Sequence, residues 1–203
     1  GGGSSLPSEL TNVGGILFFA ADDGTNGTEL WQHDPAAGAT ALVQDINPGG
    51  GSSLPSELTN VGGILFFAAD DGTNGTELWQ HDPAAGATVL VQDINPGGGS
   101  SLPSELINFN GALYFRADDG TNGRELWTSG GAVARTVLVK DIAPGGASSS
   151  PNELTTASGE LFFAADDGNR GVELWRTDTG ALQVVVTGDG CFIGTAASDI
   201  PSK

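Results

Sequence analysis

Acidic loops that recur along this chain carry the oxygen atoms that a hard cation needs. The loop Asp-Asp-Gly-Thr-Asn-Gly occupies residues 22–27, 70–75 and 118–123. Calcium takes six to eight oxygen ligands from carboxylates, amides and backbone carbonyls. The candidate calcium ligands are therefore Asp22, Asp23, Asn26, Asp70, Asp71, Asn74, Asp118, Asp119 and Asn122. No other metal or cofactor is predicted.

The same loops also have a purely structural interpretation, which we favour. Asp-Gly and Asn-Gly are strong hairpin signals, so the loop predicts a tight turn whose Asp and Asn adopt positive φ. Two adjacent Asp on a regular strand point to opposite faces, and the alternating acidic positions of an EF-hand are missing. The fourth version of the loop, residues 166–171, places Arg170 where the others have Asn. A cation at that position argues against a calcium site.

Nucleophilic catalysis has few candidates in this sequence. It needs a base and an orienting group beside the nucleophile. His33 and His81 are the only histidines and occupy equivalent positions 48 residues apart, which indicates duplication rather than one shared pocket. Cys191 is the only cysteine, and it predicts either a small buried apolar residue or an attachment point. We therefore predict no catalytic residue and no enzymatic activity.

Aromatic residues also repeat at constant spacing. Trp31, Trp79, Trp127 and Trp175 lie 48 residues apart. They could form a ring that stacks on glycans, but large aromatic side chains mainly contribute to core packing, so we favour packing. The predicted interblade core also includes Phe18, Phe19, Phe66 and Phe67. The sequons at 26–28 and 74–76 are interpreted as turn chemistry rather than as glycosylation sites, although the boundary loops could carry sugar.

These residues are positioned by a 48-residue repeat. Residues 1–48 and 49–96 differ only at Ala41 and Val89, while 97–144 is a looser copy and 145–187 a decaying one. A fixed period of this size makes the repeat the architectural unit. We therefore predict one four-repeat domain over 1–187, with blades at 1–48, 49–96, 97–144 and 145–187, followed by a tail at 188–203.

Each repeat reads as four antiparallel strands. In the second repeat we expect them near residues 55–61, 64–69, 76–81 and 88–94, separated by glycine-rich turns. The run Ile64–Ala69 is apolar on both faces, so its sheet must be covered on both sides. A closed β-propeller of four blades would provide that cover. An open stack would too, except at its two ends, and non-closing contacts of that kind build filaments.

The repeat resembles the ELWxxDGT repeat family of bacterial secreted proteins. Residues 17–24 read Leu-Phe-Phe-Ala-Ala-Asp-Asp-Gly, residues 29–31 Glu-Leu-Trp, and residues 42–49 Leu-Val-Gln-Asp-Ile-Asn-Pro-Gly. The resemblance covers about nine-tenths of the chain and implies a secreted, propeller-like protein with no established reaction. Residues 190–197 are similar to a short CFI-box motif of bacterial surface proteins, which hints at export or anchoring.

Composition limits the partners. The formal net charge is −18, which repels nucleic acid and anionic membrane surfaces. No apolar run approaches the roughly 20 residues of a membrane span. The absence of methionine indicates a processed chain or a fragment. Together with the resemblance, this composition predicts an extracellular or cell-surface bacterial protein.

The function predicted from sequence is structural. Near-identical blades without a reactive site indicate self-association into a filament or a surface layer. The alternative is a secreted binding or adhesion module that holds calcium or a glycan on its loops.

Overall fold

Four antiparallel sheets, one for each repeat, make up the computed structural model of the chain. The structure describes residues 3–132, 135–178 and 181–184. Every sheet has four strands joined in chain order, so the predicted all-β, propeller-like fold of four four-stranded blades is confirmed. The apolar and β-branched runs form the strands, and the glycine-containing segments between them form the turns. Within the described ranges, no helix is long and apolar enough to cross a membrane.

The strands fall within the repeats that the sequence defines. Blade 1 holds β1 (Ser8–Val13), β2 (Ile16–Asp22), β3 (Thr28–Asp34) and β4 (Ala39–Gln44). Blade 2 holds β5 (Ser56–Val61), β6 (Ile64–Asp70), β7 (Thr76–Asp82) and β8 (Ala87–Gln92). Blade 3 holds β9 (Ser104–Phe109), β10 (Ala112–Asp118), β11 (Arg124–Ser129) and β12 (Val137–Lys140). Blade 4 holds β13 (Asn152–Ala157), β14 (Glu160–Asp166), β15 (Val172–Asp178) and β16 (Ala181–Val184).

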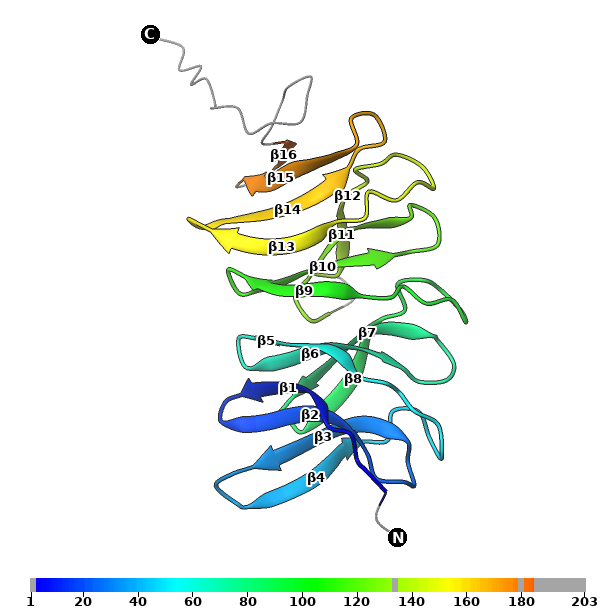
Figure 1. Ribbon diagram of the computed structural model, residues 1–203, viewed down its shortest axis with the longest axis vertical. Coiled ribbons are helices and arrows are strands. Elements are labelled where there is room, and N and C mark those ends of the chain that lie inside the picture. Colours follow the sequence, from blue (N-terminus) through cyan, green and yellow to red (C-terminus); the bar gives the residue numbers. More distant parts are fainter. Residues whose placement is uncertain (1–2, 133–134, 179–180, 185–203) are drawn as a thin grey trace.

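The blades follow one another as an open column. Figure 1 shows blade 1 at one end and blade 4 at the other. The main contacts between blades join β1 with β5, β5 with β9 and β9 with β13. Of the two arrangements that the sequence allows, the structure adopts the open stack and not a ring closed by four blades. Within the part of the chain that the structure describes, one face of blade 1 and one face of blade 4 are therefore without a neighbouring blade.

The hydrophobic core lies between blades rather than within them. Val13, Phe18, Leu30 and Ile46 of blade 1 pack against a cluster from blade 2. The blade 2 members of that cluster are Leu58, Leu65, Phe67, Ala69 and Trp79. Equivalent clusters join blade 2 to blade 3 and blade 3 to blade 4. Because successive side chains of a strand face opposite sides, a run such as Ile64–Ala69 supplies both interfaces of its blade.

Polar contacts also connect β1, β5, β9 and β13, the strands through which neighbouring blades meet. The register between β1 and β2 shifts between Ser8 and Thr11, and within that bulge Glu9 has φ of 59°. Bulges re-aim side chains, and here the Glu9 carboxylate accepts a hydrogen bond from the backbone N–H of Glu57 at 2.8 Å. Glu57 and Glu105 make a similar contact one residue further along the following blade, where each accepts a backbone N–H at 3.3 Å, from Leu106 and Leu154 respectively. The unusual conformation thus links each blade to the next.

Candidate functional site

A buried glutamate joins each of the first three blades to the blade that follows it. Glu29, Glu77 and Glu125 begin the Glu-Leu-Trp motif, and each is fully buried. The carboxylate of Glu77 accepts the hydroxyl of Ser101 at 2.6 Å and the backbone N–H of Ser101 at 2.7 Å. It also accepts the backbone N–H of Ile94 at 2.9 Å. We call this arrangement, with its equivalents at Glu29–Ser53 and Glu125–Ser149, the glutamate clamp.

Burial shifts the titration of Glu29 and Glu77. Removal from water disfavours the charged form, so burial raises the pKa of Glu29 and of Glu77. The hydrogen bonds from the serine and from the backbone oppose this shift because they stabilise the carboxylate. Three donors converge on each clamp of blades 1 and 2, which is the arrangement that a buried carboxylate requires.

Backbone contacts surround the clamp and bring the next repeat close. The Ser100 hydroxyl accepts the backbone N–H of Thr76 at 2.9 Å, and the N–H of Leu102 donates to the carbonyl of Thr76 at 3.2 Å. Gly75 has φ of 72°, and a Cβ there would lie 2.5 Å from the carbonyl oxygen of Gly99. Glycine is needed at this position for both reasons.

Blade 4 presents one half of a clamp. Glu173 is the equivalent of Glu77 but is only half-buried, and no serine of the described residues lies against it. Gly171, the equivalent of Gly75, has no described atom within 4 Å of a Cβ built on it. On the same face Leu174 is 41% exposed, whereas Leu30, Leu78 and Leu126 are fully buried. This open surface of blade 4, which also includes Phe162, is called the tail face.

Blade 1 presents the opposite half. Ser5 is exposed, whereas Ser53, Ser101 and Ser149 are buried. Leu10 is 63% exposed, whereas its equivalent Leu58 is 9% exposed. Three further residues of blade 1, Leu17, Phe19 and Trp31, are half-buried where their equivalents in blade 2 are buried. We call this surface the head face.

The predicted calcium loops are closed by their own hydrogen bonds. Oδ1 of Asp71 accepts the backbone N–H groups of Thr73 and Asn74, and Oδ2 accepts the side-chain amide of Asn74. The Asp23 and Asp119 loops repeat this pattern. The preceding residues Asp22, Asp70 and Asp118 each accept the N–H of a glycine two positions later. Among the described residues, no three His, Cys, Asp or Glu gather as a metal-binding group.

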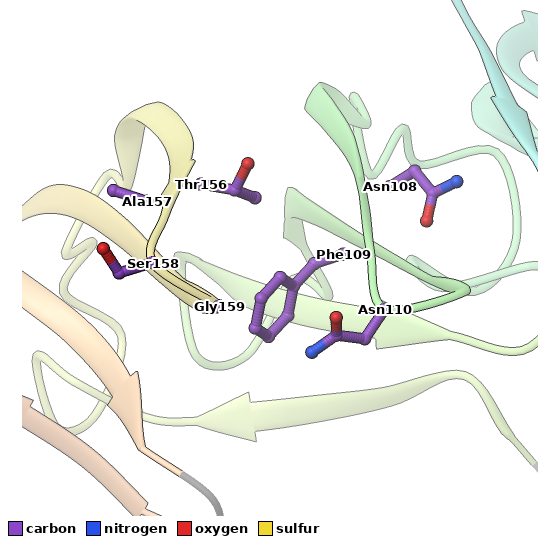
Figure 2. A pocket seen from close by; sticks show the side chains of 7 residues that line it. All are labelled: Asn108, Phe109, Asn110, Thr156, Ala157, Ser158 and Gly159. Atoms are coloured by element: carbon purple, nitrogen blue, oxygen red, sulfur yellow. The ribbon is translucent and has the colours of Figure 1, made fainter.

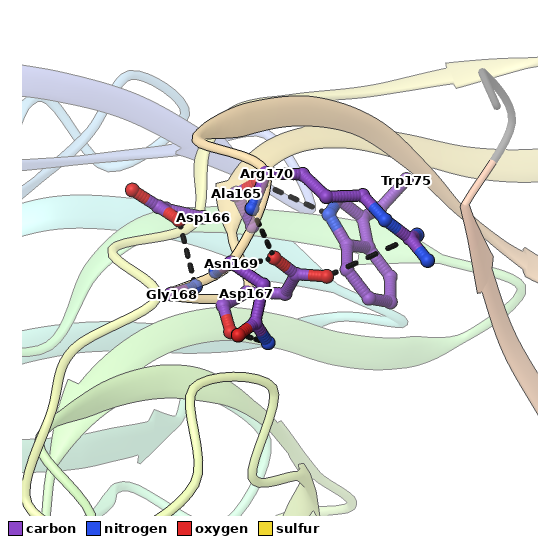
Figure 3. A network of polar contacts seen from close by, with 7 residues as sticks. All are labelled: Ala165, Asp166, Asp167, Gly168, Asn169, Arg170 and Trp175. Carbon is purple, nitrogen blue, oxygen red and sulfur yellow. Dashed lines mark hydrogen bonds and ion pairs between the residues drawn. The ribbon is translucent and has the colours of Figure 1, made fainter. Parts of the chain in front are cut away.

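In these loops positive φ falls on the glycines and not on Asp or Asn. Gly24 and Gly27 carry positive φ in the first loop, and neither Asp22, Asp23 nor Asn26 does. The aspartates act instead as hydrogen-bond acceptors. Backbone N–H groups of Asn26 and Thr25 hold the pKa of Asp23 below its usual range. Figure 3 shows the fourth loop, where Asp167 accepts the N–H groups of Asn169 and Arg170 at 2.9 Å each.

The aromatic residues lie at the interfaces between blades, except at the open end. Trp79, Trp127 and Trp175 are 4–7% exposed, whereas Trp31 lies half-buried on the head face. Trp175 stacks on Phe163. Figure 3 shows that Trp175 also donates its indole N–H to the carbonyl of Ala165, at 3.0 Å. Phe18, Phe66 and Phe67 are buried, and Phe19 is half-buried on the head face.

The two histidines lie at equivalent positions of β3 and β7. His81 is 4% exposed, packs against Phe18 of blade 1 and shares a 2.9 Å hydrogen bond with Thr88. Burial lowers the pKa of His81. Ser129 takes the equivalent place in blade 3 and bonds Thr136 in the same way, so the position has a structural role. His33 bonds Thr40. Cys191 and the CFI-like motif lie outside the described residues.

A small polar hollow lies between two turns. The β9–β10 and β13–β14 turns enclose about 200 Å³. Figure 2 shows its lining, which comprises Asn108, Phe109, Asn110, Thr156, Ala157, Ser158 and Gly159. The hollow offers amides, hydroxyls and one aromatic ring but no charged side chain, so it provides groups for recognition and no acid–base pair.

Sequence reasoning missed the glutamate clamp. The Glu-Leu-Trp motif was interpreted through its tryptophan, and no role was assigned to its glutamate. A signal was present, because a serine follows each of Glu29, Glu77 and Glu125 at a distance of 24 residues. A charged residue within an apolar strand, paired with a polar residue at constant spacing, indicates a buried hydrogen-bonded contact.

Sequence comparisons found no match for the chain. No family model matches it, and no curated protein matches it in sequence. Solved structures do match the fold. A puromycin hydrolase mutant complexed with PGG is similar with a TM-score of 0.61 and 16% identity, over 89% of this chain and 28% of that chain. A structure from a study of two prolyl endopeptidases is similar with a TM-score of 0.55 and 17% identity, over 84% and 24% respectively.

A putative TolB from Agrobacterium tumefaciens is also similar, with a TM-score of 0.52 and 12% identity, over 90% of this chain and 67% of that chain. The present chain thus spans about a quarter of the hydrolase and endopeptidase structures and two thirds of the TolB structure. Enzymes are among these neighbours, so the fold by itself does not argue against catalysis. At these identities the similarity shows the fold alone, which is a propeller-like array of four-stranded blades.

Proposed function

We propose that this chain is a non-enzymatic structural protein, located outside a bacterial cell or on its surface, whose copies associate head to tail into a filament or a surface layer. The observation that carries the proposal is the pair of unlike, complementary end faces. The tail face of blade 4 exposes the surface that blades 1 to 3 bury against a following blade. The head face of blade 1 exposes the surface that blades 2 to 4 bury against a preceding one.

Physical constraints on repeat proteins support this proposal. Each blade of a stacked array contacts only its neighbours, and soluble arrays normally end in repeats with a polar outer face. Here Leu174 at one end and Leu10 at the other are exposed. When two copies associate through unlike faces, the pair still has one free face of each kind. Further copies can therefore add, and a filament forms if the copies do not close into a ring.

The site chemistry supports a structural rather than a catalytic role. The buried carboxylates of Glu29 and Glu77 are each held by three hydrogen-bond donors from the protein. His81 is packed against an aromatic ring, with its Nδ1 bonded to a hydroxyl. These groups lie between blades, where a substrate has no access. Fold similarity to hydrolases does not transfer their activity, because function depends on the site rather than on the fold.

Electron microscopy of the purified chain tests the proposal. We expect regular filaments or sheets whose repeat distance matches one four-blade column. Sedimentation velocity over a wide concentration range should show species that grow with concentration. Particles that stay at about 20 kDa at every concentration would contradict self-association.

Glycan binding is a second candidate function, favoured by the hollow between the β9–β10 and β13–β14 turns. Phe109 could stack on a sugar ring while Asn110 and Ser158 hydrogen-bond its hydroxyls. The hollow is smaller than the roughly 300–1,000 Å³ of most ligand sites, so it suits a terminal sugar. Binding on a glycan array that Phe109→Ala abolishes would support this function, and an array without signal would contradict it.

A further inference from the structure

We propose that the contact between two copies is a fourth glutamate clamp, in which Glu173 of one copy binds the Ser4–Leu6 segment of a second copy. This inference rests on the proposed self-association and identifies its interface. The occupant of the tail face is thus a second copy of this chain. Its docking mode is the one that the chain already uses three times internally.

The three internal interfaces define the geometry of the contact. In each one the glutamate carboxylate accepts a serine hydroxyl at 2.5–2.6 Å and the N–H of that same serine at 2.7–3.0 Å. The preceding serine accepts the backbone N–H of the residue before the glutamate at 2.9 Å. The residue after the clamp serine donates its N–H to the carbonyl of the residue before the glutamate, at 3.0–3.2 Å.

Blade 4 retains the glutamate of this pattern and the backbone groups of the residue before it. The equivalent of Ile46, Ile94 and Ile142, whose N–H groups also bind the clamp glutamates, is residue 190, which lies outside the described residues. Glu173 supplies the carboxylate, and Val172 takes the place of Thr28, Thr76 and Arg124, whose contribution is made by backbone atoms alone. Gly171 has φ of 78° and open space beside it. Gly75, by contrast, lies against the carbonyl of the following segment. Blade 4 therefore presents a preformed socket for that segment.

Blade 1 retains the matching segment, in which Ser5 and Leu6 supply the donors and the Ser4 hydroxyl is the acceptor. The carbonyl of Ser5 accepts the N–H of Asp22 at 3.0 Å, just as the carbonyl of Ser53 accepts that of Asp70 at 2.9 Å. The segment is thus already held on its own blade in the conformation that the internal clamps use. Because Ser5 is exposed, its hydroxyl and N–H are available to a second copy. Binding then orders few additional groups, which favours affinity.

Apolar surfaces match in the same docking mode. Leu58 of blade 2 lies in the cluster that contains Phe18 and Leu30 of blade 1. By the same repeat, Leu10 of a second copy would meet Phe162 and Leu174. These two side chains line a cavity of about 550 Å³ together with Leu154, Thr155, Glu153 and Glu105 among others. The cavity provides space for the leucine side chain, and the contact would bury both exposed leucines.

A second copy carries the segment that fits the tail face. A Ser-Ser-Leu-Pro segment precedes blades 1 to 3, and Ser-Ser-Ser-Pro precedes blade 4. Figure 1 shows blade 1, which follows the first of these segments, at the opposite end of the column from β15, which carries Glu173. A second copy would supply an unaltered Ser-Ser-Leu-Pro segment from its head face.

Two singly blocked full-length variants test the inference. Leu10→Arg blocks the head face and leaves the tail face intact, whereas Leu174→Arg does the reverse. Each variant alone should be monomeric in sedimentation velocity. An equimolar mixture should form 1:1 dimers and nothing larger, because only one productive pair of faces is left. Leu54→Arg is the matched control, since Leu54 is also 63% exposed but lies within the column; it should assemble like the unaltered chain.

The heterodimer then isolates the clamp itself. Ser5→Ala on the Leu174→Arg copy should weaken the dimer about tenfold to a hundredfold, as expected for one hydrogen bond to a charged acceptor. The same Ser5→Ala change should have a much smaller effect when the other copy carries Glu173→Gln, because the two residues would already be uncoupled. Additive effects of the two changes would overturn the clamp.

Other outcomes separate this inference from the proposed function. If the unaltered chain forms filaments and both blocked variants do so equally, copies associate through another surface, and the inference fails while the proposed function stands. If the unaltered chain is monomeric at every concentration, the proposed function fails. Thermal unfolding of Leu174→Arg provides a final check. A large fall in the unfolding temperature of a monomer would mean that the chain covers its own tail face, which would overturn the inference.

Discussion

At the scale of single residues, the glutamate clamp places a buried carboxylate beside the hydrogen-bond donors that stabilise it. A buried carboxylate without partners is strongly unfavourable, and the clamp serine supplies two of its three hydrogen bonds. Sequence reasoning identified the motif but assigned its importance to the tryptophan. The partner lies 24 residues away, in the next repeat, and only the fold brings the two together.

Removal of a clamp hydroxyl should lower the free energy of unfolding when the serine is buried between blades, but not when it lies on the head face. We expect Ser101→Ala to lower the free energy of unfolding by about 1.5–3 kcal/mol, because Glu77 loses a short hydrogen bond to a charged acceptor. Ser5→Ala is the matched control at the equivalent exposed position, and it should change the stability of the monomer by less than about 0.5 kcal/mol. Urea unfolding of dilute protein measures both. Equal effects would contradict the clamp.

His81 should make the stability of the chain depend on pH. Burial lowers its pKa in the folded state from 6.5, with the nearby charge of Asp82 opposing the shift, so the unfolded chain binds the proton more readily. The stability that neutral His81 contributes is therefore present above about pH 6.5 and is lost as the pH falls through the lowered pKa.

The variant His81→Ser isolates this dependence, because blade 3 has Ser129 at the same position, bonded to the equivalent threonine. The difference in unfolding free energy between the unaltered chain and this variant should narrow as the pH falls from 7.5 to 5. His33→Ser, at the half-buried equivalent position in blade 1, is the matched variant to measure beside it. A constant difference for His81→Ser would mean that its burial does not affect its titration.

At the scale of elements, each strand serves two interfaces. The alternation of side chains along β6 places Phe66 against blade 3 and Phe67 against blade 1. The apolar run Ile64–Ala69 predicted cover on both faces, and the structure confirms it for blade 2. The same run in blade 1 is only partly covered, because that blade has one neighbour. Identical sequences thus have different environments according to their place in the column.

The two tryptophans of identical repeats should therefore differ in their contribution to stability. Trp79 is 7% exposed between blades 1 and 2, so Trp79→Ala should destabilise the chain by about 3–5 kcal/mol. Trp31→Ala, on the open head face, should cost less than about 2 kcal/mol because less area leaves water on folding. Chemical unfolding at a concentration where the chain is monomeric gives both values. A smaller cost for Trp79→Ala than for Trp31→Ala would contradict the order of the blades.

At the scale of the whole molecule, charge and shape act against each other. The chain has a formal net charge of −18, so two copies repel at long range even though their end faces are complementary. The charge limits association at low ionic strength, whereas the apolar faces and the clamp act only after contact.

Salt should accordingly strengthen assembly. The Debye length falls from about 30 Å at 0.01 M to about 8 Å at 0.15 M, which removes most of the repulsion before contact. We expect the concentration needed for assembly to fall by about tenfold or more over this range of sodium chloride. Light scattering monitors the transition. Calcium chloride at equal ionic strength is the control. An excess effect of calcium would support the calcium loops, whereas weaker assembly at high salt would contradict an interface between acidic copies.

The amino-acid sequence by itself determined the repeat, the four strands of each blade and the positions of their turns. These features depend on local chemistry: apolar runs such as Ile64–Ala69 form strands, and the positive φ of Gly24 and Gly27 allows the chain to turn. Tertiary structure alone decided that the column is open, that Glu77 binds Ser101, and that Trp31 and Leu174 are exposed while their equivalents are not. The physical reason is that burial and hydrogen bonding between repeats depend on which blades are neighbours, and identical repeats carry no information about where the array ends.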